Sequence, residues 1–267
     1  MPTKLKVILI AAICAALSQP LYADDAKARE IMKKVEDRDD GDNMRSDMTM
    51  VLIDKNGKQR VRSLRSFRKD KGKDTQSLMF FLSPADVTNT GFLTYDYDDP
   101  NKDDDQWLYL PALKKTKRIA AGDKSGSFMG SDLNYSDMTS RDIDDYDYTL
   151  KKEMKVRDQD VWVIESVPRS KETIEETGYE KALVFVRKDN YVVVRAISWV
   201  ESSNKLKYMD IPKLEKIDGI WTPRELTMTT KRGKQTEHQT VLKFDNVRFN
   251  QKLDESMFTT RRLEKGL

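Results

Sequence analysis

The feature that most constrains the fold of this chain is a succession of short β-rich runs separated by turn signals. The turns at 55–58 and 188–190 have the length and residue types of hairpin connections. Consecutive hairpins place neighbouring strands antiparallel, so the sequence predicts a long meander. About eleven strands are expected, in the runs SDMTMVLI, LRSFRK, SLMFFL, TGFLTY, QWLYLP, DVWVIESV, KALVFVRK, YVVVRAISWV, NKLKYMDI, ELTMTT and TVLKFDNVRF.

A meander of this length is not expected to stay flat, because the edges of its sheet must be paired, covered or curled. A strongly curved sheet or a barrel is therefore predicted. The strand at 191–200 is apolar on both faces. One face carries Val192, Val194, Ala196 and Val200, and the other carries Tyr191, Val193, Ile197 and Trp199. Such strands need cover on both sides, which a predicted helix near 26–35 and a long irregular segment can provide.

The first 23 residues have the pattern of a secretory signal peptide. Two lysines precede the apolar run at 7–17, Gln19-Pro20 interrupts it, and Ala23 precedes an acidic start. The only cysteine, Cys14, lies inside the apolar run, and Ile13 before it disfavours a lipoprotein signal. We therefore expect cleavage near Ala23, export to the periplasm, and a mature chain without thiols or disulfides. No Pro/Gly/Ser-rich linker or repeat divides residues 24–267, so a single domain is predicted.

Composition argues against several functional classes. Lys and Arg number 48 against 45 Asp and Glu, and no basic stripe with interleaved aromatic residues indicates nucleic-acid binding. His238 is the only histidine, and no metalloprotease, P-loop or dinucleotide motif is present. We expect neither an enzyme nor a bound metal or cofactor. A hydrolase that uses paired carboxylates stays open as an alternative.

The segment 111–138 is irregular yet rich in large apolar residues. It begins with a basic cluster and continues through glycines at 122, 126 and 130. Solvated loops rarely carry so many large apolar side chains, so this segment must bury them. Two interpretations remain open: a mobile lid over an apolar cavity, or a loop packed permanently onto the core.

These residues carry a resemblance to a known family. The stretch WLYLPALKKTKRIAAGDKSGSFMGSDLNYSDM resembles the signature segment of the LolA-like outer-membrane lipoprotein-sorting proteins, in the branch associated with RND-type exporters. The similarity continues through VWVIESVP, YEKALVFV, DGIWTPRELTM and the closing run FDNVRFNQKLDESMFTTRRLEKG. It implies a mainly β fold with a few helices, an incomplete antiparallel β-barrel with helices plugging one mouth. It also implies an apolar cavity that binds lipid or lipoprotein acyl chains and carries them toward the outer membrane.

The resemblance and the abundance of methionine suggest the candidate cargo site. Unbranched thioethers adapt to acyl chains of varying shape, although ordinary core packing is the alternative for each residue. The residues expected to contact cargo are Met48, Met50, Met79, Phe81, Trp107, Leu110, Phe128, Met129, Leu133, Tyr135, Met138, Trp199 and Met228. The residues expected to contact a lipid head group, an anionic membrane or an exporter are Lys114, Lys115, Lys117 and Arg118. A periplasmic sensor of lipid or lipoprotein is the alternative function, and a solvated basic turn is the alternative for the cations.

Two acidic runs at 96–105 and 142–147 offer oxygen ligands that calcium would accept. Neither run has the EF-hand spacing or its closing glutamate. We therefore interpret both runs as solvated turns.

Overall fold

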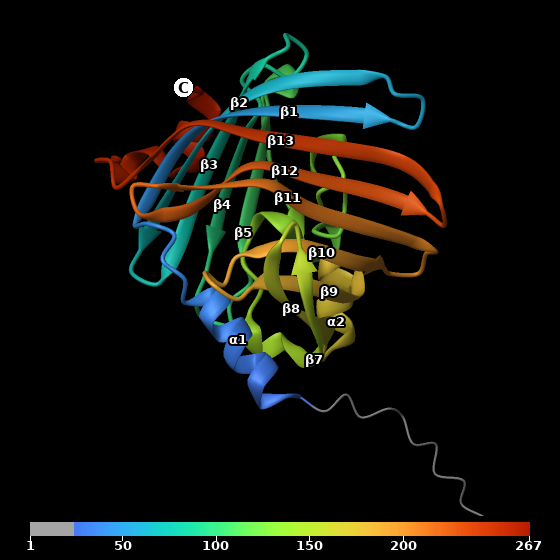
Figure 1. The fold of residues 1–267 in the computed structure, drawn as a ribbon. Coiled ribbons are helices and arrows are strands. Elements are labelled where there is room, and N and C mark those ends of the chain that lie inside the picture. The colour runs from blue at the N-terminus through green and yellow to red at the C-terminus, as the bar shows by residue number, and fades with distance from the viewer. Residues whose placement is uncertain (1–23) are drawn as a thin grey trace, which may run out of the picture.

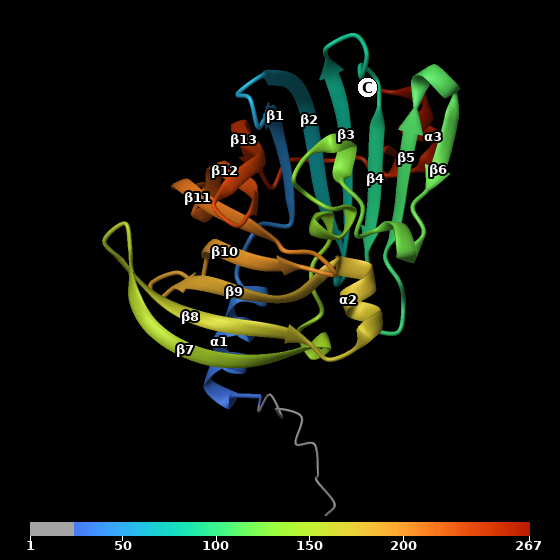
Figure 2. The ribbon, with the colours of Figure 1, turned by 90° about the vertical axis from the view of Figure 1, so that its right-hand side faces the viewer.

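The computed structural model describes residues 24–267, and the predicted signal peptide at 1–23 lies outside the described residues. One 13-stranded antiparallel sheet dominates this part of the chain, in the order β6-β5-β4-β3-β2-β1-β13-β12-β11-β10-β9-β8-β7. The sheet curves strongly and stays open between β6 and β7 (Figures 1 and 2). The prediction of an incomplete antiparallel barrel is therefore confirmed.

The strands are β1 (Asn43–Asp54), β2 (Gln59–Lys71), β3 (Asp74–Ser83), β4 (Gly91–Asp96), β5 (Asp105–Leu110), β6 (Lys115–Arg118), β7 (Tyr146–Val156), β8 (Gln159–Pro168), β9 (Tyr179–Arg187), β10 (Val193–Val200), β11 (Lys205–Ile217), β12 (Ile220–Arg232) and β13 (Gln235–Phe249). The α-helices of the described chain are α1 (Ala26–Glu36), α2 (Lys171–Thr177) and α3 (Thr260–Lys265). Every predicted β-run falls on a strand. The sequence did not predict β6, β7, α2 or α3.

The helix α1 forms where the sequence predicted it. The Asp25 carboxylate accepts a hydrogen bond from the backbone N–H of Lys27 at 2.8 Å and caps the helix. Ala28 and Ile31 are buried against an apolar cluster on β7–β9 that includes Ile164 and Val184. The opposite face of these strands carries Val163 and Phe185, so this part of the sheet is apolar on both sides.

The face assignment predicted for the strand at 191–200 is wrong. A register shift between Val193 and Arg195 moves side chains across the sheet. Val193 consequently joins Ala196 in the cluster under α1, whereas Val192 and Val194 join Ile197 on the other face. Period-2 counting assumed an uninterrupted strand and missed this bulge.

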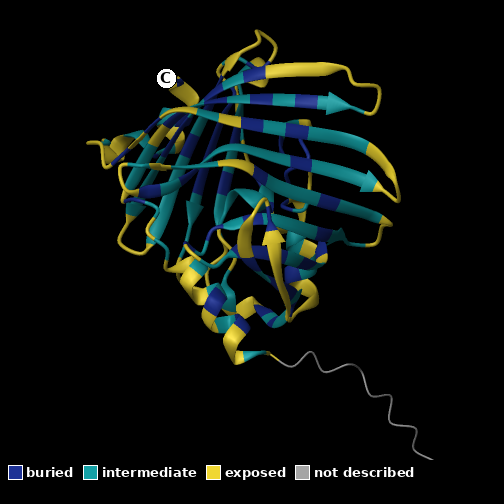
Figure 3. Cartoon of the chain, in the orientation of Figure 1, coloured by how far each residue is buried: buried dark blue, intermediate teal, exposed yellow. Residues whose placement is uncertain are grey.

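The C-terminal segment covers the outer face of β3–β5. Phe258 and Leu263 are buried against Leu78, Phe80 and Leu93. Buried positions alternate with more exposed ones along the strands (Figure 3). Among the described residues, no helix combines the length and the apolar character needed to cross a membrane.

Candidate functional site

Topology places the irregular segment inside the curve of the sheet. β6 and β7 follow one another in the sequence, yet they are the two opposite edges of the sheet. The connection between them, residues 119–145, must therefore run from one edge to the other, and we call it the insert. Figure 2 shows the insert crossing the concave side, with α2 next to it.

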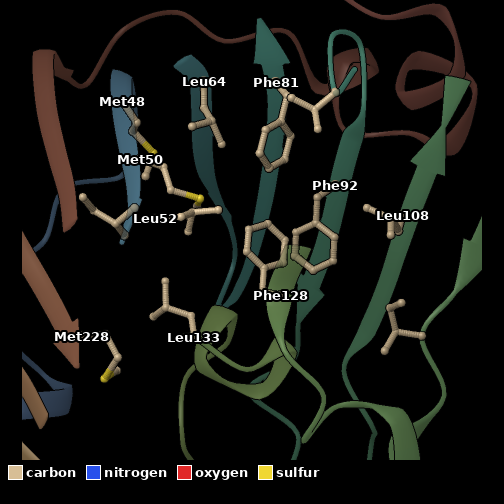
Figure 4. Packing of buried hydrophobic residues seen from close by; sticks show 13 residues of the cluster. Met48, Met50, Leu52, Leu64, Phe81, Phe92, Leu108, Phe128, Leu133 and Met228 are labelled. Atoms are coloured by element: carbon tan, nitrogen blue, oxygen red, sulfur yellow. The ribbon is translucent and has the colours of Figure 1, made fainter. Parts of the chain in front are cut away.

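The insert and the concave face of the sheet form one apolar cluster, which we call the inner cluster. Its strand residues come from β1–β5, β12 and β13, and Phe128 and Leu133 of the insert pack among them (Figure 4). All but two of the residues predicted to contact cargo belong to this cluster or pack against it: Met48, Met50, Met79, Phe81, Leu110, Phe128, Met129, Leu133, Tyr135, Met138 and Met228.

Phe128 is the centre of this packing. Its side chain is fully buried, and its ring centroid lies 5.0 Å from that of Phe92 and 5.7 Å from that of Tyr135, both in edge-to-face arrangements. Phe81 lies further away, at 6.2 Å. Such geometry adds to the free energy gained from area burial alone. In this structure the insert therefore occupies the concave face as a packed loop.

Two predicted cargo residues lie elsewhere. Trp107 points to the outer face, where its ring meets that of Tyr95 at 5.0 Å in the cluster under α3. Its neighbour Leu108 takes the inner position. The side chain of Trp199 also points away from the inner face of β10. The ammonium of Lys181 lies over its ring, 4.9 Å from the ring centroid. The sequence showed that both tryptophans are on strands but not which face of the sheet each takes.

Buried polar groups hold the insert in place. Asp132 Oδ2 accepts a hydrogen bond from the hydroxyl of Thr240 at 2.7 Å and lies 2.6 Å from His238 Nδ1, and Asp132 Oδ1 accepts one from the hydroxyl of Thr230. The backbone N–H of Asp132 donates in turn to Thr240 Oγ1 at 2.9 Å. This carboxylate thus connects the insert to β12 and β13. Charge-assisted hydrogen bonds of this kind are stronger than neutral ones.

A second polar contact lies one strand further along. Lys207 of β11 is buried and donates to Asn134 Oδ1 at 2.6 Å. Burial lowers the pKa of the Lys207 ammonium, while Asp137 and Asp132 oppose that shift. Tyr179 donates to Asp137 at 2.9 Å, and burial raises the pKa of its phenol well above the usual value.

The insert also contacts α2. The amide of Asn134 and the hydroxyl of Ser136 both donate to the carbonyl oxygen of Thr177, at 2.9 and 3.2 Å. The buried Lys124 forms an ion pair with Glu176. Sequence reasoning missed these polar residues because their partners lie on strands and helices far away in the chain.

The predicted basic cluster lies on the β5–β6 hairpin and the edge strand β6. Lys117 Nζ is 3.1 Å from Asp123, and Arg118 Nε is 2.8 Å from Asp105, so two of the four cations already have carboxylate partners. Lys114 and Lys115 are exposed at the hairpin, beside Leu113, which is 67% exposed.

The fold defines a class of protein. The open antiparallel barrel is a LolA-like fold. A LolA superfamily protein from Nitrosomonas europaea, NE2245, superposes with a TM-score of 0.66 at 18% identity, over 88% of this chain and 98% of its own.

Closer similarities define the family. A DUF1329 family protein from Desulfovibrio piger is 32% identical and superposes with a TM-score of 0.81, over 90% of this chain and all of its own (100%). A domain from Vibrio parahaemolyticus, described as that of an outer membrane lipoprotein-sorting protein, is 32% identical with a TM-score of 0.80, over 89% of this chain and 98% of its own. The model of a family described as an uncharacterized protein matches residues 73–265. No curated protein sequence matches significantly. The chain belongs to the DUF1329 family, and the predicted resemblance to LolA-like lipoprotein-sorting proteins is confirmed.

Proposed function

We propose that this protein is a periplasmic carrier that binds acyl chains of a lipid or lipoprotein noncovalently and moves them toward the outer membrane. The observation that carries the proposal is the composition of the inner cluster. Six methionines from strands and insert meet there: Met48, Met50, Met79, Met129, Met138 and Met228. Met209 packs against the same cluster.

A methionine-rich surface suits a carrier for a physical reason. Unbranched thioethers change rotamer easily and fill gaps of many shapes. Each buried methylene of an acyl chain contributes about 0.8 kcal/mol, so part of a chain binds without any polar anchor. Because the insert fills the concave face in this structure, loading requires that Phe128 and Leu133 move away and that acyl chains take their place.

The polar contacts of the insert make such an exchange chemically reasonable. Asp132, Asn134 and Lys124 can be solvated when the insert moves, whereas a purely apolar cover would expose its whole buried face to water. We further propose that an inner-membrane RND-type exporter supplies or receives the cargo, and that Lys114 and Lys115 contact that exporter or an anionic membrane surface. The proposal assigns the protein to binding proteins rather than enzymes.

Two measurements test the proposal. The mature protein is first purified from its native periplasm without detergent and analysed by native and denaturing mass spectrometry, where a stoichiometric acyl species is expected. Loaded protein is then mixed with donor and acceptor vesicles, and transfer of a fluorescent lipid is followed. Net transfer supports a carrier. Binding without transfer would instead indicate the alternative function, a sensor, and a well-folded protein that takes up no acyl species would overturn both.

A further inference from the structure

A small pocket lies at the end of the inner cluster, where β1 turns into β2. Its volume is about 260 Å³, and its walls are Leu52, Asp54, Lys58, Arg60 and His238. Leu52 belongs to the inner cluster, so the pocket adjoins the apolar concave face. Pockets that enclose a whole drug-sized ligand measure about 300–1,000 Å³. This one is of the size to hold a polar head group only.

Positively charged side chains outnumber negatively charged ones in the walls of this pocket. The Asp54 carboxylate is engaged within its own turn, where it accepts hydrogen bonds from the backbone N–H groups of Asn56 at 2.8 Å and Lys58 at 3.0 Å. His238 is bound to Asp132. Within residues 24–267, no carboxylate oxygen lies within 4.0 Å of the side-chain nitrogens of Lys58 or Arg60. Lys58 and Arg60 therefore face the pocket without an ion-pair partner, and Asp54 attracts Lys58 only across a longer distance.

A third cation lies one position deeper on the same face of β2. Arg60 pairs with Leu52 and Arg62 pairs with Met50, so Arg62 sits between the pocket and the inner cluster. Its side chain donates to the carbonyl oxygen of Met129 at 2.6 Å and lies over the ring of Phe81, yet only 9% of the residue is exposed. No carboxylate of the described chain forms an ion pair with it.

Burial lowers the pKa of the Arg62 guanidinium, repulsion from Arg60 adds to that effect, and attraction to the more distant Asp86 carboxylate opposes it. A buried charge without an ion-pair partner is costly, and a second like charge next to it raises that cost. An anion placed between these groups would remove the imbalance. Guanidinium groups present a planar set of donors that suits phosphate and carboxylate oxygens.

We propose that this pocket holds an anionic head group, a phosphate or carboxylate, of the acyl-chain cargo. Arg60 and Lys58 contact the head group, Arg62 neutralises it from below, and the acyl chains continue past Leu52 into the inner cluster. This assignment rests on the proposed function, because it takes the inner cluster as the place of the chains. It adds the chemical class of the cargo, an anionic amphiphile.

The test compares three soluble probes by isothermal titration calorimetry with the mature protein: dihexanoyl phosphatidylglycerol, the uncharged dihexanoylglycerol and glycerol 3-phosphate. The phosphatidylglycerol is expected to bind about tenfold more tightly than dihexanoylglycerol, as one charge-assisted contact predicts. Arg60→Gln should remove most of that preference without changing the affinity for dihexanoylglycerol. Arg248→Gln is the matched control, because Arg248 is also exposed and lies on β13 outside the pocket.

Each outcome has a distinct meaning. Equal affinities for the two acyl probes, unchanged in Arg60→Gln, would overturn the head-group site while leaving the acyl carrier intact. Failure of both acyl probes to bind would overturn the proposed function itself. Tight binding of glycerol 3-phosphate, equal to that of phosphatidylglycerol, would identify the pocket as a site for free phosphates and would also refute the head-group assignment. Thermal melting confirms that each variant is folded.

Discussion

The sheet is covered on both sides, and the two covers are built differently. The C-terminal segment lies on the outer face, where Phe258 and Leu263 pack among aromatic and aliphatic residues. The insert lies on the inner face, where apolar packing around Phe128 is combined with buried polar contacts through Asp132 and Asn134. The outer cover also has polar contacts, such as the hydrogen bond from the Tyr95 hydroxyl to the Phe258 carbonyl oxygen at 2.6 Å and the exposed Lys69–Glu255 ion pair. The inner cover differs in that its polar contacts centre on a buried carboxylate, Asp132.

This difference indicates which cover is suited to move. Apolar burial is not directional, and every displacement of the outer cover exposes hydrocarbon to water. The insert also buries hydrocarbon, but its hydrogen bonds to the Asp132 carboxylate have specific geometry, and bonds to water recover part of their free energy when the loop moves. The insert also contains Met129 in the left-handed region, at φ 51°, next to Gly130 at φ 74°. A side chain in that conformation is strained, and the strain favours an alternative arrangement of the loop.

The largest effect is expected from truncation of the central ring of the insert. Phe128→Ala should lower the free energy of unfolding by about 3–5 kcal/mol, because the cavity left among Phe92, Phe81 and Tyr135 collapses only partly. Urea denaturation measures the change. Leu113→Ala serves as the control, since Leu113 is largely exposed and should have almost no effect. A loss below about 1 kcal/mol for Phe128→Ala would mean that the insert is not packed in solution.

The second-largest effect is expected from removal of the Asp132 carboxylate, and it distinguishes stability from the rate of loading. Asp132→Ala leaves the hydroxyls of Thr230 and Thr240 and the ring of His238 without their shared acceptor, so a loss of about 1–3 kcal/mol is expected. The variant should also take up a fluorescent fatty acid faster in stopped-flow mixing, because the insert opens more readily. Leu263→Ala on the outer cover should destabilise the protein without accelerating uptake. Equal rates in wild type and Asp132→Ala would show that the polar contacts do not control loading.

A pH effect is expected where the insert ends. Ser140 donates its backbone N–H and its hydroxyl to Asp96, both at 2.8 Å, and burial together with the Asp96 charge raises the pKa of nearby Asp104 to about 6. The folded state thus binds the Asp104 proton more tightly than the unfolded state. The contribution of Asp104 to stability is therefore present below pH 4 and is lost as pH rises to 6.

The variant Asp104→Asn tests this directly. An uncharged amide oxygen can still accept the hydrogen bond from the backbone N–H of Tyr97, so the variant should be more stable than wild type at pH 7 by on the order of 1 kcal/mol, after allowance for partial exposure. Its melting temperature should also vary less between pH 4 and 6. Parallel pH profiles for the two proteins would contradict the assignment.

The smallest effect is expected on the basic hairpin. Lys117→Gln removes a solvent-exposed ion pair with Asp123 and should change the free energy of unfolding by less than about 0.5 kcal/mol. The same urea titration measures it. A larger loss would show that the start of the insert depends on this pair.

The two strands that were not predicted from the sequence both lie at an edge of the sheet. β6 and β7 are the two edges of the sheet, and their runs KTKR and YDYTLKKEMKV carry many charges. Edge strands are commonly charged because charge discourages pairing with other molecules, and that same composition removes the apolar pattern by which strands are predicted. The interior strands were predicted because they bury at least one face, and that burial gives their sequences an apolar pattern.

Local patterns in the chain therefore determined the meander, the N-terminal helix and the set of apolar residues available for an inner cluster. Hydrophobic periodicity and turn residues act over a few positions, and they need no distant partner. The tertiary structure decided which face each tryptophan takes, where β10 bulges, and how the insert is held. Those outcomes depend on the pairing of β1 with β13 and on contacts such as that of Asp132 with Thr240, whose residues lie 108 positions apart.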